Sequence, residues 1–432
     1  MTVLLNGRLV GTFHMKSNGA ISFQYDQDWL NWEHAMPISL SLPLTETAYK
    51  GAAIFSYLEN LLPDNQVIRD RVAAKVGAAG TDAYNMLEKI GKDCVGALQF
   101  IADYKGGQEK NELTGEPLTD AEIADILNNL ASAPLGIEKD GDFRISIAGA
   151  QEKTALLYHE GHWKRPTGTT PTTHMLKTQL GTLPNGINLR DSVENEFFCM
   201  RFCKAMGANV ADVEIRDFAE TRALVIARFD RKWGRSGNLL RLPQEDFCQA
   251  MGYPPSLKYQ SDGGPTVPDC IKLLDGSDSP TEDQSAFFFA QILFWLIGAT
   301  DGHAKNFSIF LRTGGGFKMT PLYDVLSAQK AVDDGQVRLG QMRLAMSLGE
   351  KNHYRVDEIA RRHFIQSARQ CGFGVELVQE LLVRAYERVP EALDKTEGQL
   401  PDDFPQGLLS SLKKGIESRR NFLGMALDAV SG

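Results

Sequence analysis

Residues 299–310 read ATDGHAKNFSIF and follow a long apolar stretch. Within six residues this segment carries an acid, Asp301, and an amide, Asn306, with His303 between them. The preceding residues 284–297 are hydrophobic on all sides, which predicts a buried helix, and Gly298 is a residue that can end it. The sequence therefore predicts a polar loop at the rim of a hydrophobic core.

The segment after this loop predicts a β-hairpin. Residues 307–311 and 317–320 read as short strands, and residues 312–316 between them include three glycines. Asp324 follows the second strand. Because a hairpin returns the chain to near its start, we expect the carboxylates of Asp301 and Asp324 to face one cleft.

Two carboxylates and an amide oxygen suit Mg²⁺ and phosphoryl transfer. Magnesium prefers hard oxygen ligands, and phosphoryl transfer needs a carboxylate to orient or deprotonate the attacking hydroxyl. In protein kinases the same spacing separates that acid from a metal-binding Asn, and a metal-binding Asp follows later. Asp301, Asn306 and Asp324 reproduce this order. The alternative is that Asp and Asn serve here only as good turn formers.

The first half of the chain predicts a site for phosphate. Four residues of a small-residue turn lie between apolar segments predicted as strands, and their N–H groups can approach phosphate oxygens: Ala148, Gly149, Ala150 and Gln151. The turn matches neither common phosphate-loop motif, so a plain hairpin turn is the alternative. Lys177 lies in the apolar segment 174–178, where a cation invites an anionic partner or extends to water.

Other segments predict a mixture of strands and helices. The Asn-Gly pairs at 6–7 and 18–19 predict N-terminal hairpins, because this dipeptide favours the two-residue hairpin turn. Further strands are expected over 38–42, 143–147, 154–158 and 223–229, and helices over 52–62, 67–76, 120–131, 191–205, 356–370, 375–389 and 405–427.

Composition and charge restrict the class of protein. The chain has 432 residues, a hydrophobic fraction of 43% and a net charge of −9, which speaks against a free-standing nucleic-acid binder. Its six cysteines form no C-x-x-C pair, so neither a zinc ribbon nor a disulfide framework is indicated. The apolar run 286–299 is shorter than a membrane span requires, and no signal peptide is evident. We therefore expect a cytoplasmic protein with reduced thiols and no membrane association.

Several stretches together resemble the HipA family, the serine/threonine kinase toxins of bacterial HipBA-type toxin–antitoxin modules. They occur in the family's order along almost the whole chain: SLSLPL (39–44), ENLLPD (59–64), FRISIAGAQEKTALL (143–157), THMLK (173–177), RFDRKW (228–233), LRLPQED (240–246), GATDGHAKNFSIF (298–310) and PLYDV (321–325).

The resemblance implies an α+β, protein-kinase-like fold of two lobes. The N-terminal lobe is expected over 1–247, with a β-rich subdomain specific to the family over 1–104 and the phosphate loop, ATP lysine and inter-lobe connection over 140–247. The all-helical C-terminal lobe, expected over 248–432, would carry the catalytic loop and the metal-binding Asp.

The resemblance also implies roles for individual residues. Asp301 is similar to the catalytic base, Asn306 and Asp324 to the Mg²⁺ ligands, and Lys177 to the lysine that binds ATP phosphates. Further positions resemble nucleotide-contacting residues: Phe229, Asp230, Gln244, His303 and Tyr323. Ala227 departs from the acidic residue expected before the inter-lobe connection, which removes one expected hydrogen bond to adenine.

Regulation and partners are implied in the same way. Ser146 matches the family's autophosphorylated serine, and a phosphate there would compete with ATP for the amides of residues 148–151. The expected partners are a dimeric helix-turn-helix antitoxin of the HipB type, operator DNA bound mainly through that antitoxin, and a protein substrate such as an aminoacyl-tRNA synthetase. The alternatives are a kinase of small molecules, such as sugars or antibiotics, and a catalytically silent corepressor subunit.

Overall fold

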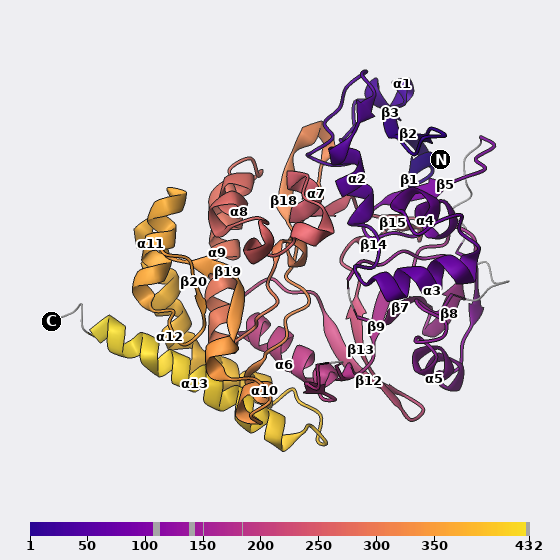
Figure 1. The fold of residues 1–432 in the computed structure, drawn as a ribbon. Helices are drawn as coiled ribbons and strands as arrows, with labels where there is room; N and C mark the ends of the chain where they lie inside the picture. Colours follow the sequence, from indigo (N-terminus) through magenta and orange to yellow (C-terminus); the bar gives the residue numbers. More distant parts are fainter. Residues whose placement is uncertain (107–112, 138–142, 150, 184, 429–432) are drawn as a thin grey trace. The chain divides into compact units, whose positions relative to one another are not determined.

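The computed structural model describes residues 1–106, 113–137, 143–149, 151–183 and 185–428 (Figure 1). The chain divides into two compact units that interleave along the sequence instead of dividing once near residue 247. Unit 1 contains Met1–Thr178, Arg216–Pro255 and Ser308–Phe317, and unit 2 contains Gln179–Ile215, Ser256–Phe307 and Lys318–Gly432. Strand pairing explains part of this interleaving, because β17 (Ser308–Leu311) pairs antiparallel with β16 (Gln244–Asp246) in unit 1.

Unit 1 begins with a five-stranded antiparallel sheet in the order β4-β3-β2-β1-β5. Its apolar face packs with the next helices around a core in which the Phe13 ring lies 4.5 Å from that of Phe23 and 6.0 Å from that of Phe100. The elements are β1 (Thr2–Leu5), β2 (Arg8–Met15), β3 (Ile21–Tyr25), α1 (Gln27–Leu30), β4 (Tyr49–Lys50), α2 (Ala52–Glu59), α3 (Gln66–Val76), α4 (Ala83–Ile90) and β5 (Leu98–Ile101).

A second sheet, of six strands in the order β12-β13-β9-β7-β8-β6, holds the strands next to the predicted phosphate turn. Helix α5 (Asp120–Asn128) covers it, with Ile123 and Leu127 packed in one core with Leu176. The strands are β6 (Gly115–Pro117), β7 (Lys153–His159), β8 (His162–Pro166), β9 (His174–Lys177), β12 (Val213–Phe218) and β13 (Thr221–Ala227). The remaining elements of unit 1 are β14 (Arg231–Trp233), β15 (Leu239–Arg241), β16 and α7 (Phe247–Met251).

Unit 2 is built around the buried helix α9 (Pro280–Ile297), whose residues from Phe287 to Ile297 are all buried. It contacts α8 (Val267–Leu274), α12 (Val375–Glu397) and α13 (Gln406–Asp428), which surround it in Figure 1. The other elements are β10 (Gly181–Thr182), β11 (Asn188–Leu189), α6 (Ser192–Ala205), α10 (Gln329–Asp333), β19 (Arg343–Leu348), β20 (His353–Arg355) and α11 (Arg361–Cys371). Strand β18 (Phe317–Met319) lies at the boundary between the units.

The structure confirms the buried helix, both N-terminal hairpins and the hairpin after the 299–310 segment. Two predicted strands are wrong. Residues 38–42 form only an isolated bridge between Ser39 and Leu42, because the amide of Leu42 donates to the carbonyl of Ser39 at 3.0 Å and closes a tight turn there. Residues 143–147 belong to no strand; the amide of Ser146 instead donates to the carbonyl of Asp93.

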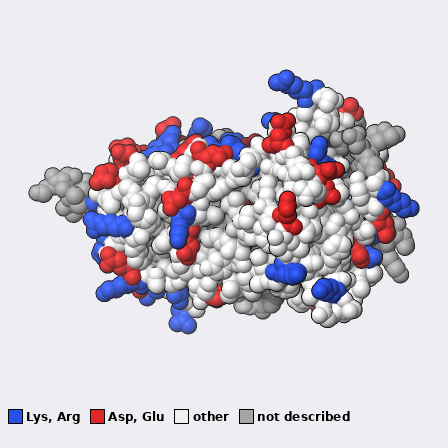
Figure 2. Space-filling view, turned by 90° about the horizontal axis from the view of Figure 1, so that it is seen from above, with Lys and Arg blue, Asp and Glu red and all other residues white. Residues whose placement is uncertain are grey.

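The C-terminal part is mostly helical, as expected, but it also contains the short strands β19 and β20. Helix α11 begins at Arg361, so the expected start at 356 is wrong; Val356 instead accepts a hydrogen bond from the Trp295 indole at 3.0 Å. No helix in the described ranges is long and apolar enough to cross a membrane. Figure 2 shows Lys and Arg interspersed with Asp and Glu on the face that it views.

Candidate active site

The loop after α9 holds Asp301 and Asn306 in one compact turn of unit 2. The amide Nδ2 of Asn306 donates to the backbone carbonyl of Asp301 at 2.6 Å, which holds residues 301–306 in a closed turn. Asn306 is 4% exposed, whereas the Asp301 side chain is 58% exposed. The loop thus presents an accessible carboxylate beside a buried, fixed amide, whose oxygen remains as a hard donor atom.

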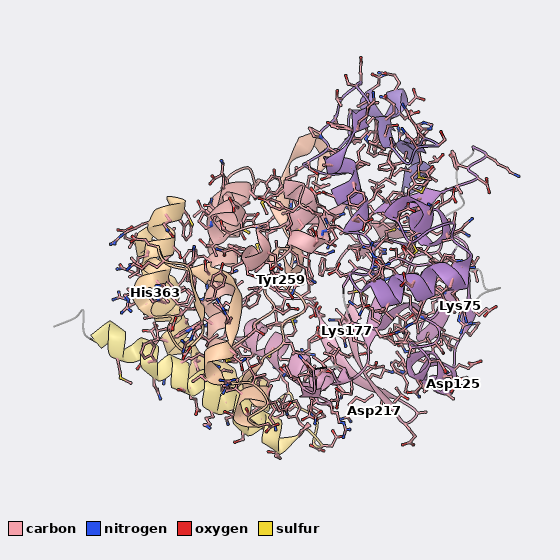
Figure 3. All side chains as sticks on the ribbon, viewed as in Figure 1. Lys75, Asp125, Lys177, Asp217, Tyr259 and His363 are labelled. Carbon is pink, nitrogen blue, oxygen red and sulfur yellow. The ribbon has the colours of Figure 1, made fainter. Side chains whose placement is uncertain are left out.

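Two aromatic residues surround the Asp301 carboxylate. The hydroxyl of Tyr259, labelled in Figure 3, donates to Oδ1 at 2.5 Å. The Nε2 atom of His303 lies 3.9 Å from the same oxygen, and its ring meets the Tyr259 ring edge-on at 4.9 Å. One carboxylate oxygen is therefore held by Tyr259. No spacing or motif in the sequence pointed to Tyr259, which precedes the loop by a whole helical segment.

Glycine at position 302 is required by a close approach. A Cβ atom there would lie 2.3 Å from the ring of Phe294 on α9. Such contacts do not occur between real atoms, so a larger residue would push the loop away from the helix. The buried ring of Phe294 thus sets the position of the adjacent Asp301 relative to the core.

Asp324 lies on a segment that is hydrogen-bonded to this loop. The Tyr323 hydroxyl donates to the backbone carbonyl of Lys305 at 2.8 Å, and Ala299 forms a bridge with Ser327. Asp324 is half-buried and has a φ of 60°, a left-handed conformation that a non-glycine residue adopts only at a cost of about 1–3 kcal/mol. The structure therefore holds Asp324 in an unfavourable backbone conformation close to the Asp301 loop.

A side chain from α6 fixes the far end of the same segment. Asn195 donates from Nδ2 to the carbonyl of Ser327 at 2.9 Å and accepts from the amide of Ser327 at 3.0 Å. The Ser327 hydroxyl in turn donates to the carbonyl of Ile297 at 2.6 Å. Both ends of the Asp324 segment are thereby tied to the loop that carries Asp301 or to the end of the helix before it.

The donor set of unit 2 fits a magnesium ion. Two carboxylates, Asp301 and Asp324, and the amide oxygen of Asn306 are oxygen donors on two connected segments. In the described ranges no group of three or more His, Cys, Asp or Glu side chains forms a metal cluster. A cation held by these three oxygen donors would keep positions for water or phosphate oxygens, as magnesium usually does.

The small-residue turn of unit 1 is held by hydrogen bonds to backbone carbonyls, donated by one backbone amide and two side chains. Gly149 has a φ of 110°, which favours glycine, and its carbonyl accepts from the amide of Asp64 at 3.1 Å. The Nζ atom of Lys153 donates to the carbonyl of Ala148 at 3.0 Å. Gln151 donates from Nε2 to the carbonyl of Thr178 at 2.9 Å, next to Lys177. Ala150, also predicted to contact phosphate, lies outside the described residues.

Ser146 precedes this turn and is completely buried. Its hydroxyl donates to the carbonyl of Leu61 at 2.7 Å, and its amide donates to the carbonyl of Asp93 at 3.0 Å. A phosphate group could not fit at this position without movement of the segment, because the serine side chain has no solvent-exposed surface.

Lys177, labelled in Figure 3, ends β9 directly opposite Lys153 on β7. The two residues are 4% and 6% exposed. Like charges opposite each other on a strand ladder repel, so this pair favours a nearby anion. Of these two lysines, only Lys177 was predicted to bind phosphate. Lys153 could have been found as well, because it begins the neighbouring apolar strand β7.

The residues expected to bind the nucleoside gather around β16. Gln244 is opposite Phe310 in the β16–β17 register, and the Phe310 ring meets that of Phe229 edge-on at 5.8 Å. Gln244 is 8% exposed, and in the parts that the structure describes its Oε1 atom has no hydrogen-bond partner. Phe229 and Phe310 thus provide an aromatic surface, and Gln244 provides a hydrogen-bond acceptor. Phe310 was not predicted, because only strand pairing brings it here.

Asp230 has a different environment from the one expected of a ribose ligand. Its carboxylate accepts from Arg228 at 2.7 Å and from the amide of Gly96 at 2.7 Å, and it lies 2.9 Å from Arg231. The residue is 4% exposed. In this structure Asp230 thus belongs to a buried ion-pair network, and contact with ribose would require some of these bonds to open.

The chain resembles known proteins over nearly its whole length. A family model described as the HipA-like C-terminal domain matches residues 145–394, and one described as the HipA N-terminal domain matches residues 1–101. The chain belongs to the HipA family. These matches include both sets of candidate site residues.

Two curated relatives and one solved structure of the family are similar to this chain. "Putative kinase Y4mE" of Sinorhizobium fredii is 34% identical over 91% of this chain and 90% of its own. The serine/threonine-protein kinase toxin HipA of Shewanella oneidensis is 28% identical over 87% of this chain and 84% of its own. A chain from the complex of HipA, HipB and operator DNA of the same organism superposes with a TM-score of 0.82, at 25% identity, covering 98% of this chain and 97% of that one.

Proposed function

We propose that this protein is a Mg-ATP-dependent serine/threonine protein kinase and the toxin of a HipBA-type module. The observation that carries the proposal is the bonded pair of segments bearing Asp301, Asn306 and Asp324, anchored through Tyr323 and Ser327. The similarity to a kinase toxin over 87% of the chain supports the same assignment.

In this proposal Asp301 accepts the proton of the attacking hydroxyl. Its exposed side chain is accessible to a protein substrate, and the Tyr259 hydroxyl holds Oδ1, which orients the carboxylate. The hydroxyl oxygen attacks the γ-phosphorus as the bond to the leaving diphosphate breaks, and the proton moves to the carboxylate. Mg²⁺, held by Asn306 and Asp324, would neutralise charge on the phosphates. His303, beside the carboxylate, would contact the same phosphates.

Residues of unit 1 bind the nucleotide in this proposal. Lys177 and its cross-strand neighbour Lys153 supply positive charge for phosphate oxygens, and the backbone amides of residues 148–151 add donors. Phe229 and Gln244 provide contacts for the base. The Tyr323 hydroxyl donates its proton to the Lys305 carbonyl, so toward a nucleotide its oxygen would act as an acceptor and its ring as an apolar surface.

The proposed regulation acts through Ser146. Since the serine is fully buried, its phosphorylation requires the 143–149 segment to leave its place, and two added negative charges would then oppose its return. After incubation with Mg-ATP, wild-type protein should bind nucleotide much more weakly than Ser146→Ala in a fluorescence titration. Equal affinity of the two samples would refute this mechanism.

The proposed partners are a small helix-turn-helix antitoxin dimer and, through it, operator DNA. The solved complex of HipA, HipB and operator DNA is the model for this assembly. The net charge of −9 agrees with a partner that carries most of the DNA affinity. Co-purification with the product of an adjacent small gene, followed by a DNA mobility shift, tests the assembly.

Labelled ATP and a cell lysate test the reaction itself. Wild-type protein should label protein bands and Asp301→Gln should not, while Asp262→Asn, a change at an exposed acid near Tyr259, should behave as wild type. Transfer of label only to small molecules would favour a sugar or antibiotic kinase. Growth arrest that persists in Asp301→Gln, without any transfer, would indicate a silent corepressor.

A further inference from the structure

One buried carboxylate lies at the centre of unit 1 and has no role in the mechanism above. Asp93 follows α4 and is 2% exposed. Its Oδ1 accepts from Arg231 at 2.8 Å and from Arg241 at 3.0 Å. Its Oδ2 accepts from the amide and hydroxyl of Thr172 at 3.0 and 2.8 Å, and from Arg228 at 3.3 Å. Its carbonyl accepts from the amide of Ser146.

The network around Asp93 contains three buried guanidinium groups and two carboxylates, Asp93 and Asp230. Burial alone would raise the pKa of Asp93, but Arg231, Arg241 and Arg228 outweigh it and hold the pKa below the usual range. Burial, together with the charge of Arg228, lowers the pKa of Arg231 to about 10. Against the effect of burial, the pKa of Asp230 is lowered and that of Arg228 is raised by their mutual attraction, so both carboxylates and the guanidinium groups of Arg228 and Arg231 stay charged near neutral pH.

Such a network is a poor way to stabilise a fold. Taking charges out of water costs free energy that their mutual attraction repays only with well-placed hydrogen bonds, and apolar residues of similar volume are often as stable. What a fully bonded network does provide is a fixed geometry.

The partners of Asp93 come from the segments that carry the nucleotide-binding residues. Thr172 leads into β9, which ends in Lys177, and Arg228 directly precedes Phe229. Arg241 ends β15, just before Gln244, and Ser146 precedes the turn at Gly149. A single residue from the N-terminal subdomain thus bonds to every one of these segments.

We propose that Asp93 is a positioning residue for nucleotide binding, which holds these four segments in register and links them to Ser146. The inference rests on the proposed function. When the Ser146 segment leaves, Asp93 loses the backbone bond that it accepts from Ser146, and the segments around it lose a constraint. Release of Ser146 then lowers nucleotide affinity through the network as well as through the lost amides of the turn.

Thr172 offers a mild way to test this role. Its hydroxyl donates to Asp93 and accepts from Arg228 at 2.8 Å, and neither partner is among the residues proposed to contact ATP. Thr172→Val keeps the shape and removes both bonds, and Thr172→Ser restores them. Asp93→Asn removes the central charge. Asp217→Asn, in an exposed ion pair with Arg222, is the matched control.

Direct titration with a fluorescent ATP analogue, and steady-state kinetics with a protein substrate, are the measurements. Thr172→Val should raise the Kd for nucleotide and the KM for ATP about tenfold, while kcat and the KM for the protein substrate stay within about twofold. Thr172→Ser and Asp217→Asn should match wild type. Asp93→Asn, if folded, should show a larger loss of affinity than Thr172→Val.

The outcomes separate this inference from the proposed function. If wild type binds nucleotide and Thr172→Val binds it equally well, the positioning role of Asp93 is wrong and the kinase assignment stands. If wild type itself binds no nucleotide, the proposed function fails first. A loss of kcat with unchanged KM would also contradict the inference. If Asp93→Asn does not fold, the comparison of Thr172→Val with Thr172→Ser still tests the positioning role.

Discussion

The two groups of candidate site residues, one in each compact unit, are held in place in different ways. In unit 2, Asp301, Asn306 and Asp324 lie within one short stretch of chain, and hydrogen bonds to backbone carbonyls hold them together. In unit 1 the residues proposed to bind the nucleotide are scattered from the turn at Ala148 to Gln244, and a buried ionic network around Asp93 connects their segments. The first arrangement depends on local geometry and the second on charges far apart in sequence.

This difference predicts how each half responds to mutation. A residue at the tip of a local loop can be removed without loss of stability, because little is packed against it. A residue at the centre of a buried network cannot, because its partners are left charged and unpaired. Activity and stability should therefore separate in unit 2 and fall together in unit 1.

The largest expected effect follows from removing the central charge. Asp93→Ala leaves three buried guanidinium groups around one remaining carboxylate and should cost about 3–5 kcal/mol of the free energy of unfolding. Asp301→Ala, at a side chain that is 58% exposed, should change it by no more than about 1 kcal/mol, the worth of its bond from Tyr259, while abolishing phosphate transfer. Urea unfolding of both variants measures the contrast. Equal stability losses would show that the two halves are not built differently.

A second buried acid of unit 1 should make stability depend on pH. Burial raises the pKa of Glu245 to about 8, although the amide of Leu40 donates to its Oε1 at 2.8 Å. The folded protein therefore keeps a proton that the unfolded chain loses above its usual pKa of 4.5. Stability from this group is complete below pH 4.5 and is lost as the pH rises to about 8, by roughly 5 kcal/mol in total, since each unit of pKa difference is worth about 1.4 kcal/mol.

Glu245→Gln removes this titration and keeps the size of the side chain. The free energy of unfolding of the variant, measured by urea titration from pH 5 to pH 9, should be flatter than that of wild type. Glu116→Gln, at an exposed position, provides the control and should leave the wild-type slope unchanged. Parallel curves for wild type and Glu245→Gln would mean that Glu245 is ionised in the folded protein.

The smallest expected effect concerns the hydrogen bond to Asp301 in unit 2. Tyr259→Phe removes the hydroxyl that donates to Asp301 and keeps the ring beside His303. It should lower kcat about five- to tenfold, because one net hydrogen bond is worth about 1 kcal/mol, and the KM for ATP should not change. Initial rates of phosphorylation, measured over a range of ATP concentrations, give both kcat and the KM for ATP. A changed KM with unchanged kcat would assign Tyr259 to nucleotide binding instead of to orientation of the base.

The sequence was most informative where short-range rules decide the outcome. The all-apolar pattern predicted α9, and the glycine-rich link predicted the β17–β18 hairpin. The order of Asp301, Asn306 and Asp324 gives a prediction for the site that the proposed experiments test. Strands whose polar groups find other partners were predicted wrongly, as at 38–42, where serine hydroxyls bond to the Gln249 carbonyl.

What the sequence by itself determined is therefore the family, the mixed α+β class and the acid–amide–acid order, since each is written in neighbouring residues. Only the tertiary structure decided that Lys153 lies opposite Lys177, that Tyr259 holds Asp301, and that Asp93 joins Thr172 to three arginines. The physical reason is that strand register and buried charge pairing join residues far apart in the chain, and no local pattern records which partner a buried charge will find.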